Sequence, residues 1–515
     1  MYTLKNPMLA IDSYKLGHMS QYPEGTTKVY CNLTARNFKF IKELFPKEIN
    51  FFNDTAVVFG LSATIQEIYD VYEEEFFKKD IDTLLKEFSI HIKPFIGDSD
   101  DSIILENFKK LHDLGYLPLI FKTLDEGTSV KENIPMMTWY NTHPDFAWLP
   151  NYLETFISSQ TWKLSTAATI AKVYKRIFSH FAIKTGSSLD FIDIQGHDFS
   201  SRGMSCFIDS SRTGSGHLTS FIGSDSISSV SFVNKYYKDP TESLIACSVP
   251  ATEHSVQCMG GKESELDTYK RILKQYDTGV VSIVSDTWDY WDLITNGVAK
   301  LKEDILNRKK DSLGLCKTVF RPDSGDPADI ICGTSSELHS LEQTPQEKGS
   351  VAVLDEEFGS EVNSLGYKTL DSRVGLIYGD SITPARAYDI LNRLFEKNFA
   401  ADNIVFGIGS FTYQHITRDT LGFAIKATYA EINGEPVQIY KEPKTDTGKN
   451  SAKGMMRVFK DDNDEYYLRD GFESDDGGYL KVRFEDGKFC NLPSFTEIRS
   501  NLSKELNAIN NTGKA

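Results

Sequence analysis

Seven short apolar runs, rich in β-branched residues, dominate the middle of the chain between residues 190 and 406. Each run ends in a polar loop, and a segment with helical spacing of its apolar residues follows. Strands that alternate with helices predict βαβ units and a parallel sheet. Seven units over roughly 220 residues have the size of a barrel, so we expect an irregular (β/α) barrel. The runs are DFIDI (190–194), HLTSFI (217–222), SLIACSV (243–249), VVSIV (280–284), KTVF (317–320), VGLIY (374–378) and NIVF (403–406).

The two ends of the chain show other patterns. Residues 60–88 and 150–184 carry apolar side chains at helical spacing, which predicts amphipathic helices. Residues 424–440 alternate in polarity around Asn433-Gly434, a strong hairpin signal. Residues 455–489 contain further short apolar runs between acidic turns, so the C-terminal part is expected to be antiparallel and β-rich.

These patterns predict the domain organisation. The chain has 515 residues, and division by a typical domain size gives a prior of about three domains. The repeating strand and helix pattern instead assigns residues 166–410 to one α/β barrel. Residues 1–165 and 411–515 are expected to combine into one discontinuous β-rich α+β domain with helices.

The charge balance excludes several classes of partner. The chain has 56 basic and 73 acidic residues, a net charge of −17 and a pI near 5.2. Nucleic-acid and anionic-membrane binders obtain much of their affinity from Lys and Arg, so we expect neither partner. The sequence has neither an apolar run near the ~18 residues of a membrane span nor the pattern of a secretory signal at its start. Seven scattered cysteines without CxxC pairs indicate a reduced, cytoplasmic protein without a zinc site.

The polar residues that follow the seven runs are the candidate functional groups. Loops at the carboxyl ends of parallel barrel strands converge on one rim. Arginines and glycine-loop amides bind phosphate oxygens, whereas aspartates bind ribose hydroxyls or Mg²⁺. Both sets together predict a sugar-phosphate substrate with a metal, although single Asp or Gly residues after a strand are also ordinary turn residues. The candidates are Asp198, Phe199, Arg202, Asp225, Glu253, His254, Asp286, Arg321, Asp323, Gly379, Asp380, Gly409 and Ser410.

Several of these loops carry motifs in an order specific to one family. The chain resembles the type II phosphoribosyltransferases, which include the nicotinamide and nicotinate phosphoribosyltransferases, and it is most similar to the nicotinamide branch. The match runs across most of the chain. The motifs are DSYKxxHxxQYP from Asp12, HDFSSRG at 197–203, SVPATEHS at 248–255, VSD at 284–286, RPDSGDP at 321–327, GD at 379–380 and TRD at 417–419.

The resemblance implies an activity and an assembly. It implies transfer of the 5-phosphoribosyl group from 5-phosphoribosyl 1-pyrophosphate to the ring nitrogen of nicotinamide, with Mg²⁺ held mainly through pyrophosphate and water. The barrel would be the catalytic domain of a head-to-tail homodimer whose active sites use both subunits. ATP would be a coupled phosphoryl donor, because His254 matches the histidine that accepts a phosphoryl group in this family.

The resemblance also implies a role for each matching residue. The pyridine ring would stack between Phe199 and Tyr14 of the partner subunit, and Asp225 would accept a hydrogen bond from the carboxamide. Arg202 and Arg321 would lie against the amide end of the ring and the phosphates. The ribose would be held by Asp323, Gly379 and Asp380, the metal–pyrophosphate water network by Asp286, the 5′-phosphate by Gly409 and Ser410, and cationic contacts from the second subunit would come from Arg36, Arg418, Lys426 and Lys441.

Alternative interpretations of single residues stay open from the sequence. Phe199 is also typical of a core residue, Asp225 of a helix N-cap and His254 of a structural histidine. Two positions depart from the family pattern, with Ser200-Ser201 in the pocket loop and Ser410-Phe411 in the phosphate loop.

Ala424 also replaces a serine that often contacts the phosphates in this family. The competing functions are a nicotinate phosphoribosyltransferase and a non-catalytic protein that binds a phosphoribosyl compound or dinucleotide. A carboxylate at Asp225 would repel nicotinate, which favours nicotinamide.

Overall fold

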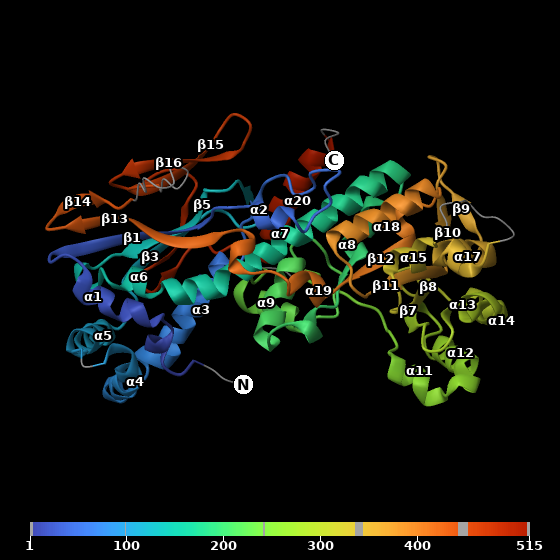
Figure 1. Ribbon diagram of the computed structural model, residues 1–515, viewed down its shortest axis with the longest axis horizontal. Coiled ribbons are helices and arrows are strands. Elements are labelled where there is room, and N and C mark those ends of the chain that lie inside the picture. Colours follow the sequence, from blue (N-terminus) through green and yellow to red (C-terminus); the bar gives the residue numbers. More distant parts are fainter. Residues whose placement is uncertain (1–3, 98, 240–242, 335–342, 441–451, 512–515) are drawn as a thin grey trace.

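The computed structural model describes residues 4–97, 99–239, 243–334, 343–440 and 452–511. An antiparallel sheet and a parallel sheet lie toward opposite ends of an elongated molecule (Figure 1). The helix α7 (Glu154–Thr185) passes between the two regions and is buried along most of its length. The boundary expected between residues 165 and 166 falls inside this helix, and the division into domains stays a prediction.

The antiparallel sheet combines strands from both ends of the chain. Its seven strands have the order β14-β13-β1-β5-β3-β17-β18. This confirms the β-rich region formed from both ends. The strands are β1 (Thr26–Ala35), β3 (Leu119–Thr123), β5 (Pro135–Asn141), β13 (Phe423–Ile432), β14 (Glu435–Gln438), β17 (Lys481–Glu485) and β18 (Lys488–Phe489).

The predicted hairpin and helices of this region are confirmed. Strands β13 and β14 are joined by Asn433 and Gly434, both of which have positive φ, as a two-residue hairpin turn requires. A second hairpin, β15 (Met455–Lys460) and β16 (Tyr466–Phe472), follows the predicted pattern of short strands. The helices that pack on this part of the molecule are α3 (Leu61–Tyr72), α4 (Ile81–Ile96), α5 (Ser102–Leu114) and α6 (Leu149–Tyr152).

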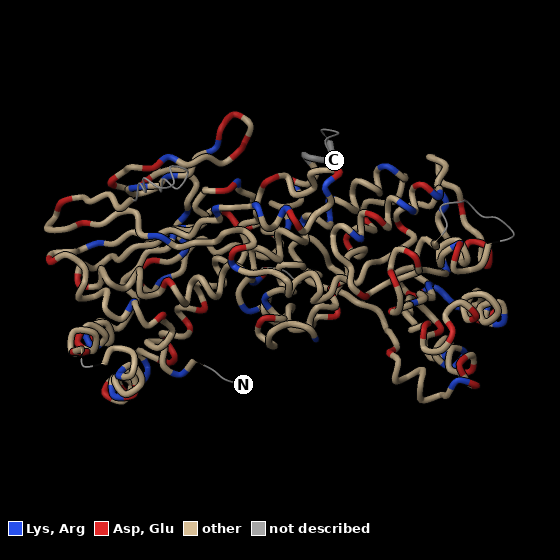
Figure 2. Tube along the Cα trace, viewed as in Figure 1, with Lys and Arg blue, Asp and Glu red and all other residues tan. Residues whose placement is uncertain are grey.

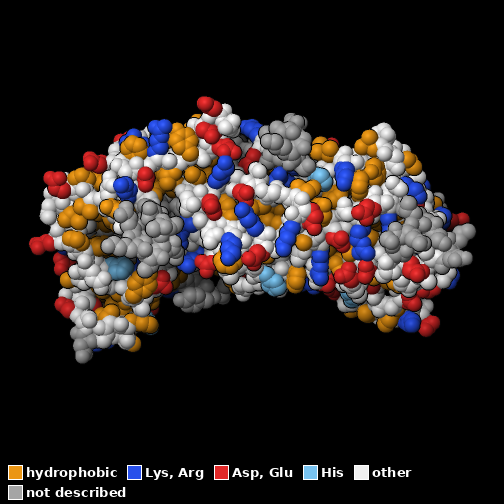
Figure 3. All heavy atoms as spheres, turned by 45° about the horizontal axis from the view of Figure 1, so that its top comes forward, with side chains coloured by type: hydrophobic (Ala, Val, Ile, Leu, Met, Phe, Trp, Pro, Cys, Tyr) orange, Lys and Arg blue, Asp and Glu red, His pale blue; other side chains and the backbone are white. Residues whose placement is uncertain are grey.

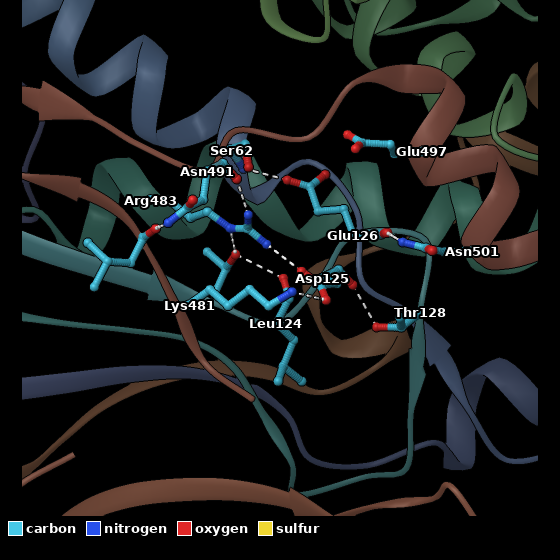
Figure 4. Close-up of polar contacts among 12 residues, drawn as sticks. Ser62, Leu124, Asp125, Glu126, Thr128, Lys481, Arg483, Asn491, Glu497 and Asn501 are labelled. Atoms are coloured by element: carbon cyan, nitrogen blue, oxygen red, sulfur yellow. Dashed lines mark hydrogen bonds and ion pairs between the residues drawn. The ribbon is translucent and has the colours of Figure 1, made fainter. Parts of the chain in front are cut away.

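Residues distant in sequence meet beside the C-terminal helix α20 (Phe495–Asn511), around a cavity of about 620 Å³ (Figure 4). Asp125 accepts hydrogen bonds from Lys481 Nζ at 2.7 Å and Arg483 Nη2 at 2.8 Å. The neighbouring Glu126 is buried and accepts a hydrogen bond from the Ser62 amide at 2.7 Å, at the start of α3. A carboxylate at a helix N-terminus satisfies free backbone donors and the helix dipole. These contacts tie β17 and the loop after β3 to α3.

The parallel sheet curls into an irregular barrel, as expected. Its five strands have the order β6-β12-β11-β8-β7. Isolated parallel bridges join Asp198 to Ser224, Gly223 to Cys247 and Ala251 to Ser282, and thereby connect the two edge strands. The strands are β6 (Gly196–Asp198), β7 (Gly279–Val284), β8 (Cys316–Arg321), β11 (Val374–Tyr378) and β12 (Ile404–Ile408).

Helices flank this barrel, as βαβ units require (Figure 1). They are α9 (Phe207–His217), α10 (Ile227–Tyr236), α12 (Glu265–Gln275), α14 (Val298–Leu306), α15 (Pro327–Cys332), α17 (Ser350–Phe358) and α18 (Pro384–Glu396).

The prediction of a strand is wrong for three of the seven apolar runs. The run 190–194 forms a 3-10 turn and the short helix α8 (Ile192–Gln195), because Ser188 caps the amide of Asp190 and starts a helical turn. The strand begins two residues later, at Gly196. The run 217–222 forms the end of α9 and a turn, where His217 and its neighbours continue the helical hydrogen bonds.

The run 243–249 forms only a single bridge at Cys247. The carbonyl groups of Leu244 and Ile245 accept hydrogen bonds from the Arg499 guanidinium at 2.8 and 2.5 Å. A side chain of α20 therefore replaces a neighbouring strand as the partner of this segment.

Charged residues of both signs are spread over both regions (Figure 2). Figure 3 shows basic and acidic side chains intermingled on one face, without a continuous basic surface there. Among the described residues, no helix has both the length and the apolar character needed to cross a membrane.

Candidate active site at the barrel rim

The polar residues expected at one rim follow the carboxyl ends of the barrel strands. Phe199 follows β6, Asp286 follows β7, and Arg321 ends β8. Gly379 follows β11 and Gly409 follows β12. Because these strands are parallel neighbours, their ends lie at the same edge of the sheet.

Asp286 is the centre of the polar network at this rim. Its Oδ2 accepts hydrogen bonds from the Asp323 amide at 2.9 Å and from the Ser324 hydroxyl, and its Oδ1 lies 3.0 Å from His254 Nε2. Burial acts to raise the pKa of Asp286, but the hydrogen bonds from Ser324, Asp323 and His254 outweigh it and lower the pKa below its usual value. The carboxylate is therefore a stable anion that fixes one nitrogen of His254.

His254 stands at the first position of α11 (His254–Gly260), and 48% of its side chain is exposed. The contact with Asp286 uses Nε2, and the imidazole remains open to solvent. A carboxylate that orients an imidazole is a common arrangement around a reactive histidine. The contact with Asp286 satisfies one ring nitrogen, so the choice between a structural and a reactive histidine stays a prediction.

Arg321 and Asp323 form a second part of the network. The Arg321 Nη2 donates a hydrogen bond to the Thr252 carbonyl at 2.8 Å, and Arg321 Nε lies 3.5 Å from Asp323 Oδ2. Burial raises the pKa of Asp323, Arg321 opposes the shift, and the carboxylates of Asp286 and Asp380 add to it. Three carboxyl groups and one guanidinium thus influence one another at this point of the rim.

Phe199 lies half-buried beside Gly407 of β12. A Cβ atom on Gly407 would lie 2.8 Å from Phe199 Cδ2 and 2.6 Å from Gly379 Cα, so only glycine leaves room for this packing. The His197 ring lies beside Phe199, with 4.7 Å between the ring centroids. Phe199 therefore presents a fixed aromatic ring at the rim instead of filling the core.

Asp225 lies on the segment beside β6 that the bridge from Asp198 to Ser224 holds in place. Its Oδ1 lies 3.0 Å from His197 Nε2 and accepts a hydrogen bond from the Ser248 hydroxyl. The N-cap of α10 is Ser226, so the Asp225 side chain does not cap that helix. The side chain is 42% exposed and can meet a ligand.

Ser410 and Phe411, which depart from the family pattern, follow β12 and pack in different ways. A Cβ atom on Gly203 would lie 2.0 Å from Ser410 Oγ, so Ser410 packs closely against the loop that carries Arg202. Phe411 stays partly exposed and packs on His415, with 4.9 Å between the ring centroids. Ser410 and Phe411 both belong to the short helix α19 (Ser410–Tyr413), and Gly409 is its N-cap.

The remaining predicted residues lie away from the rim. Arg36, Ala424 and Lys426 line a cavity of about 1310 Å³ on the antiparallel sheet. The neighbours of Arg418, Thr417 and Asp419, line the same cavity, and the Arg418 side chain is exposed. Tyr14 is 65% exposed near the N-terminus, and its ring contacts His18. Lys441 lies outside the described residues.

The structure thus brings the predicted rim residues together, whereas the residues predicted to act from a second subunit lie elsewhere in the chain. No hydrogen bond, ion pair or ring contact between described residues joins Tyr14, Arg36 or Arg418 to a predicted residue of the rim. The strand register explains why Arg36 and Lys426 share a surface. Asn32 pairs with Lys426 and Thr34 pairs with Ala424 across β1 and β13, and Arg36 follows Thr34 by two residues, so its side chain points to the same side of the sheet.

The rim offers oxygen ligands for a metal, but the described residues contain no group of three or more His, Cys, Asp or Glu side chains that could hold one by themselves. Mg²⁺ prefers oxygen ligands and usually retains water or substrate oxygens. The accessible carboxylates of Asp323 and Asp380 therefore suit an ion shared with a substrate, not a closed protein site, whereas only 4% of the Asp286 side chain is exposed.

Three residues at the rim were not assigned a role from the sequence. His197 and Ser248 lie inside the motifs HDFSSRG and SVPATEHS, so position in a motif was their only signal. Arg386, on α18, donates a hydrogen bond to the Ser381 carbonyl at 2.6 Å and lies over the Phe411 ring. It links the loops after β11 and β12, and no pattern in the sequence marks it.

A comparison with protein families decides the relationship that these motifs indicate. The model described as the nicotinate phosphoribosyltransferase (NAPRTase) family matches residues 194–476, more than half of the chain and all of the rim loops. The chain belongs to the nicotinate phosphoribosyltransferase family. A second model, the N-terminal domain of nicotinamide phosphoribosyltransferase, matches residues 6–92.

Relatives match this family member over nearly its whole length. A nicotinamide phosphoribosyltransferase of Acinetobacter baylyi is 46% identical over 505 residues, 97% of this chain and 98% of the relative. A nicotinamide phosphoribosyltransferase of Mycoplasma pneumoniae is 34% identical and covers 87% of this chain and 95% of the relative.

Solved structures support the fold of the family member. A nicotinate-nucleotide pyrophosphorylase from Pyrococcus furiosus aligns with a TM-score of 0.57 at 13% identity, over 99% of this chain and 98% of that one. Human nicotinic acid phosphoribosyltransferase aligns with a TM-score of 0.51 at 14% identity, over 96% and 93% of the two chains.

Proposed function

We propose that this chain transfers the 5-phosphoribosyl group of 5-phosphoribosyl 1-pyrophosphate to the ring nitrogen of nicotinamide, with nicotinamide mononucleotide and pyrophosphate as products. The observation that carries this proposal is the Asp225 carboxylate, which lies open on the same rim as the Phe199 ring. An ionised carboxylate accepts a hydrogen bond from an amide NH₂ and repels the carboxylate of nicotinate. The curated relatives named above carry the same activity in their names.

The reaction needs positioning and charge stabilisation more than covalent catalysis. The ring nitrogen attacks C1 of the ribose as the bond from C1 to pyrophosphate breaks, and the electron pair leaves with pyrophosphate. Arg321 stabilises the departing charge, and Asp323 with Gly379 and Asp380 holds the ribose. When bound with pyrophosphate, Mg²⁺ would neutralise part of its charge, and Asp286 would support the water network around it. The arrangement requires no protein nucleophile.

A head-to-tail homodimer would bring the two groups of predicted residues together. Tyr14, Arg36, Arg418 and Lys426 lie away from the rim of their own chain, so they would complete the rim of the partner subunit. The proposed interface includes apolar side chains of α9 and α10 next to the rim loops. These side chains are Phe207, Ile208 and Ile227, and all three are exposed in the single chain.

ATP would act through His254. Asp286 fixes Nε2, so the exposed imidazole can attack the γ-phosphorus of ATP through its other nitrogen, Nδ1, as the bond to the bridging oxygen breaks and ADP leaves. The new phosphate would lie beside the rim, where it can alter binding of the phosphoribosyl substrate. We further propose that the protein acts in the cytoplasm, where ATP and phosphoribosyl compounds are present.

Parallel assays with nicotinamide and nicotinate test the proposal. Each contains phosphoribosyl pyrophosphate and Mg²⁺, with and without ATP, and the nucleotide product and pyrophosphate are quantified. We expect nicotinamide mononucleotide and a clear preference for the amide. Preference for the acid would favour the nicotinate activity, and tight binding without release of pyrophosphate would favour a non-catalytic binding protein.

A further inference from the structure

We propose that His197 and Ser248 position the Asp225 carboxylate by binding one of its oxygens, so that only the other oxygen can accept a hydrogen bond from a ligand. Together, His197, Ser248 and Asp225 would set the preference for an uncharged amide substrate over a carboxylate substrate. The inference rests on the proposed function and assigns its specificity to two residues behind the substrate-contacting carboxylate. His197 and Ser248 act through Asp225 and are positioning residues.

Both donors bind the same oxygen of Asp225. His197 Nε2 lies 3.0 Å from Oδ1, and the Ser248 hydroxyl donates to that same atom. His197 Nε2 also lies 3.5 Å from Ser248 Oγ, so the three side chains form a closed cluster. No hydrogen bond from the described part of the chain reaches Asp225 Oδ2. Oδ2 is therefore left for a ligand, while the hydrogen bonds to Oδ1 restrain rotation of the carboxylate.

His197 is itself held rigidly. It belongs to β6, where it pairs with Gly407 of β12, and only 10% of its side chain is exposed. One side of the ring packs on Phe199. On another side, a Cβ atom at Gly223 would lie 2.8 Å from His197 Nδ1, so glycine leaves the space that the ring needs. The imidazole therefore cannot turn away from Asp225 without moving the aromatic ring.

The electrostatics agree with an ionised acceptor. Burial acts to raise the pKa of Asp225, but hydrogen bonds from His197 and Ser248 and the charge of Arg321 outweigh it, and the pKa lies below its usual value. Asp198 of the same strand, β6, and the buried His217 of α9 are further titratable groups close to His197. An anionic oxygen that faces the ligand favours an NH₂ donor and disfavours a second carboxylate.

The test measures kcat/KM for nicotinamide and for nicotinate in three variants of the full chain. His197→Leu removes the donor, His197→Gln keeps an NH₂ group near the position of Nε2, and Ser248→Ala removes the second donor at an exposed position. We expect the ratio of nicotinamide to nicotinate to fall about tenfold or more in His197→Leu, mainly through KM for nicotinamide. His197→Gln should restore most of the ratio, and Ser248→Ala should lower it about threefold.

A folded His197→Leu variant with an unchanged ratio overturns the inference, even if its overall rate is lower. If this variant does not fold, the ratio of Ser248→Ala decides, and an unchanged ratio there overturns it equally. The wild-type chain in the same assays keeps the proposed function separate. An inactive wild type rejects that function and this inference with it, whereas an active wild type with insensitive variants rejects the inference alone.

Discussion

The barrel rim and the cavity on the antiparallel sheet differ in the chemistry that they offer. The rim combines an aromatic ring, an arginine and several carboxylates in one hydrogen-bonded network around Asp286. The sheet cavity is lined by two of the predicted cations, Arg36 and Lys426, and also by His415 and the carboxyl groups of Glu43, Glu132, Asp419 and Asp470. Unlike His254 at the rim, His415 has no hydrogen bond or ion pair with a carboxylate among the described residues. In the proposed homodimer, the rim of one subunit would perform the reaction, and the sheet of the second subunit would supply charge for a phosphate.

Arg321→Ala should have the largest effect, because it removes the guanidinium that lies beside Asp323 and would stabilise departing pyrophosphate. We expect kcat/KM to fall about 10²–10³-fold, with most of the loss in kcat. Steady-state kinetics with saturating nicotinamide measure it. Arg373→Ala is the matched control, because Arg373 pairs with Asp371 at the amino end of β11, away from the rim. Equal losses in the two variants would contradict the role of the rim.

Gly407→Ala tests the packing of the rim without a change of charge. The added Cβ would lie 2.6 Å from the Gly379 backbone and 2.8 Å from the Phe199 ring, and backbone cannot move aside easily. We expect a loss of about 1–3 kcal/mol in the free energy of unfolding, together with reduced activity. Urea denaturation measures the stability. Gly409→Ala should be nearly neutral for stability because no atom lies within 4 Å of its added Cβ, so similar losses would refute this explanation.

Lys426→Ala tests the other side of the comparison. Removal of a cation that would contact the phosphate should raise KM for phosphoribosyl pyrophosphate about tenfold and leave kcat largely unchanged. Lys28→Ala is a control on the same sheet, since Lys28 pairs with Glu431 at 2.7 Å near the far end of β1. A large fall in kcat with unchanged KM would indicate that Lys426 acts in the chemical step, and would contradict the proposed difference between the barrel rim and the sheet cavity.

His254→Ala should have the smallest effect on the basal reaction. The variant loses the imidazole that Asp286 orients, so we expect stimulation by ATP to disappear while part of the basal transfer remains. Rates with and without ATP, at subsaturating substrate, measure it. His91→Ala, an exposed histidine on α4, should keep the full stimulation. Persistence of ATP stimulation in His254→Ala would reject the phosphohistidine role.

The sequence predicted the parts of the fold where local preference and tertiary structure agree. The runs 280–284, 317–320, 374–378 and 403–406 form strands of the barrel, as predicted. The run 190–194 forms helical turns because an apolar run of five residues fits either structure, and the cap at Ser188 decides.

The rim could be predicted because parallel strands bring successive loops to one edge, which follows from topology alone. Contacts between side chains could not, and His197 and Ser248 became visible only through the atoms that they place on Asp225. Arg386 likewise reaches the loops from the body of α18, which no spacing in the sequence reveals.

Hybrid dimers test the central claim most directly. Asp225→Ala inactivates the rim of a chain and Tyr14→Ala its contribution to the partner, so a hybrid of the two retains one intact site and one doubly altered site. With random mixing, half of the dimers are hybrids, and the account predicts about a quarter of wild-type nicotinamide mononucleotide formation after the two inactive variants are refolded together. Activity no higher than the mean of the two separate variants would contradict a site shared between the rim of one subunit and Tyr14 of the other.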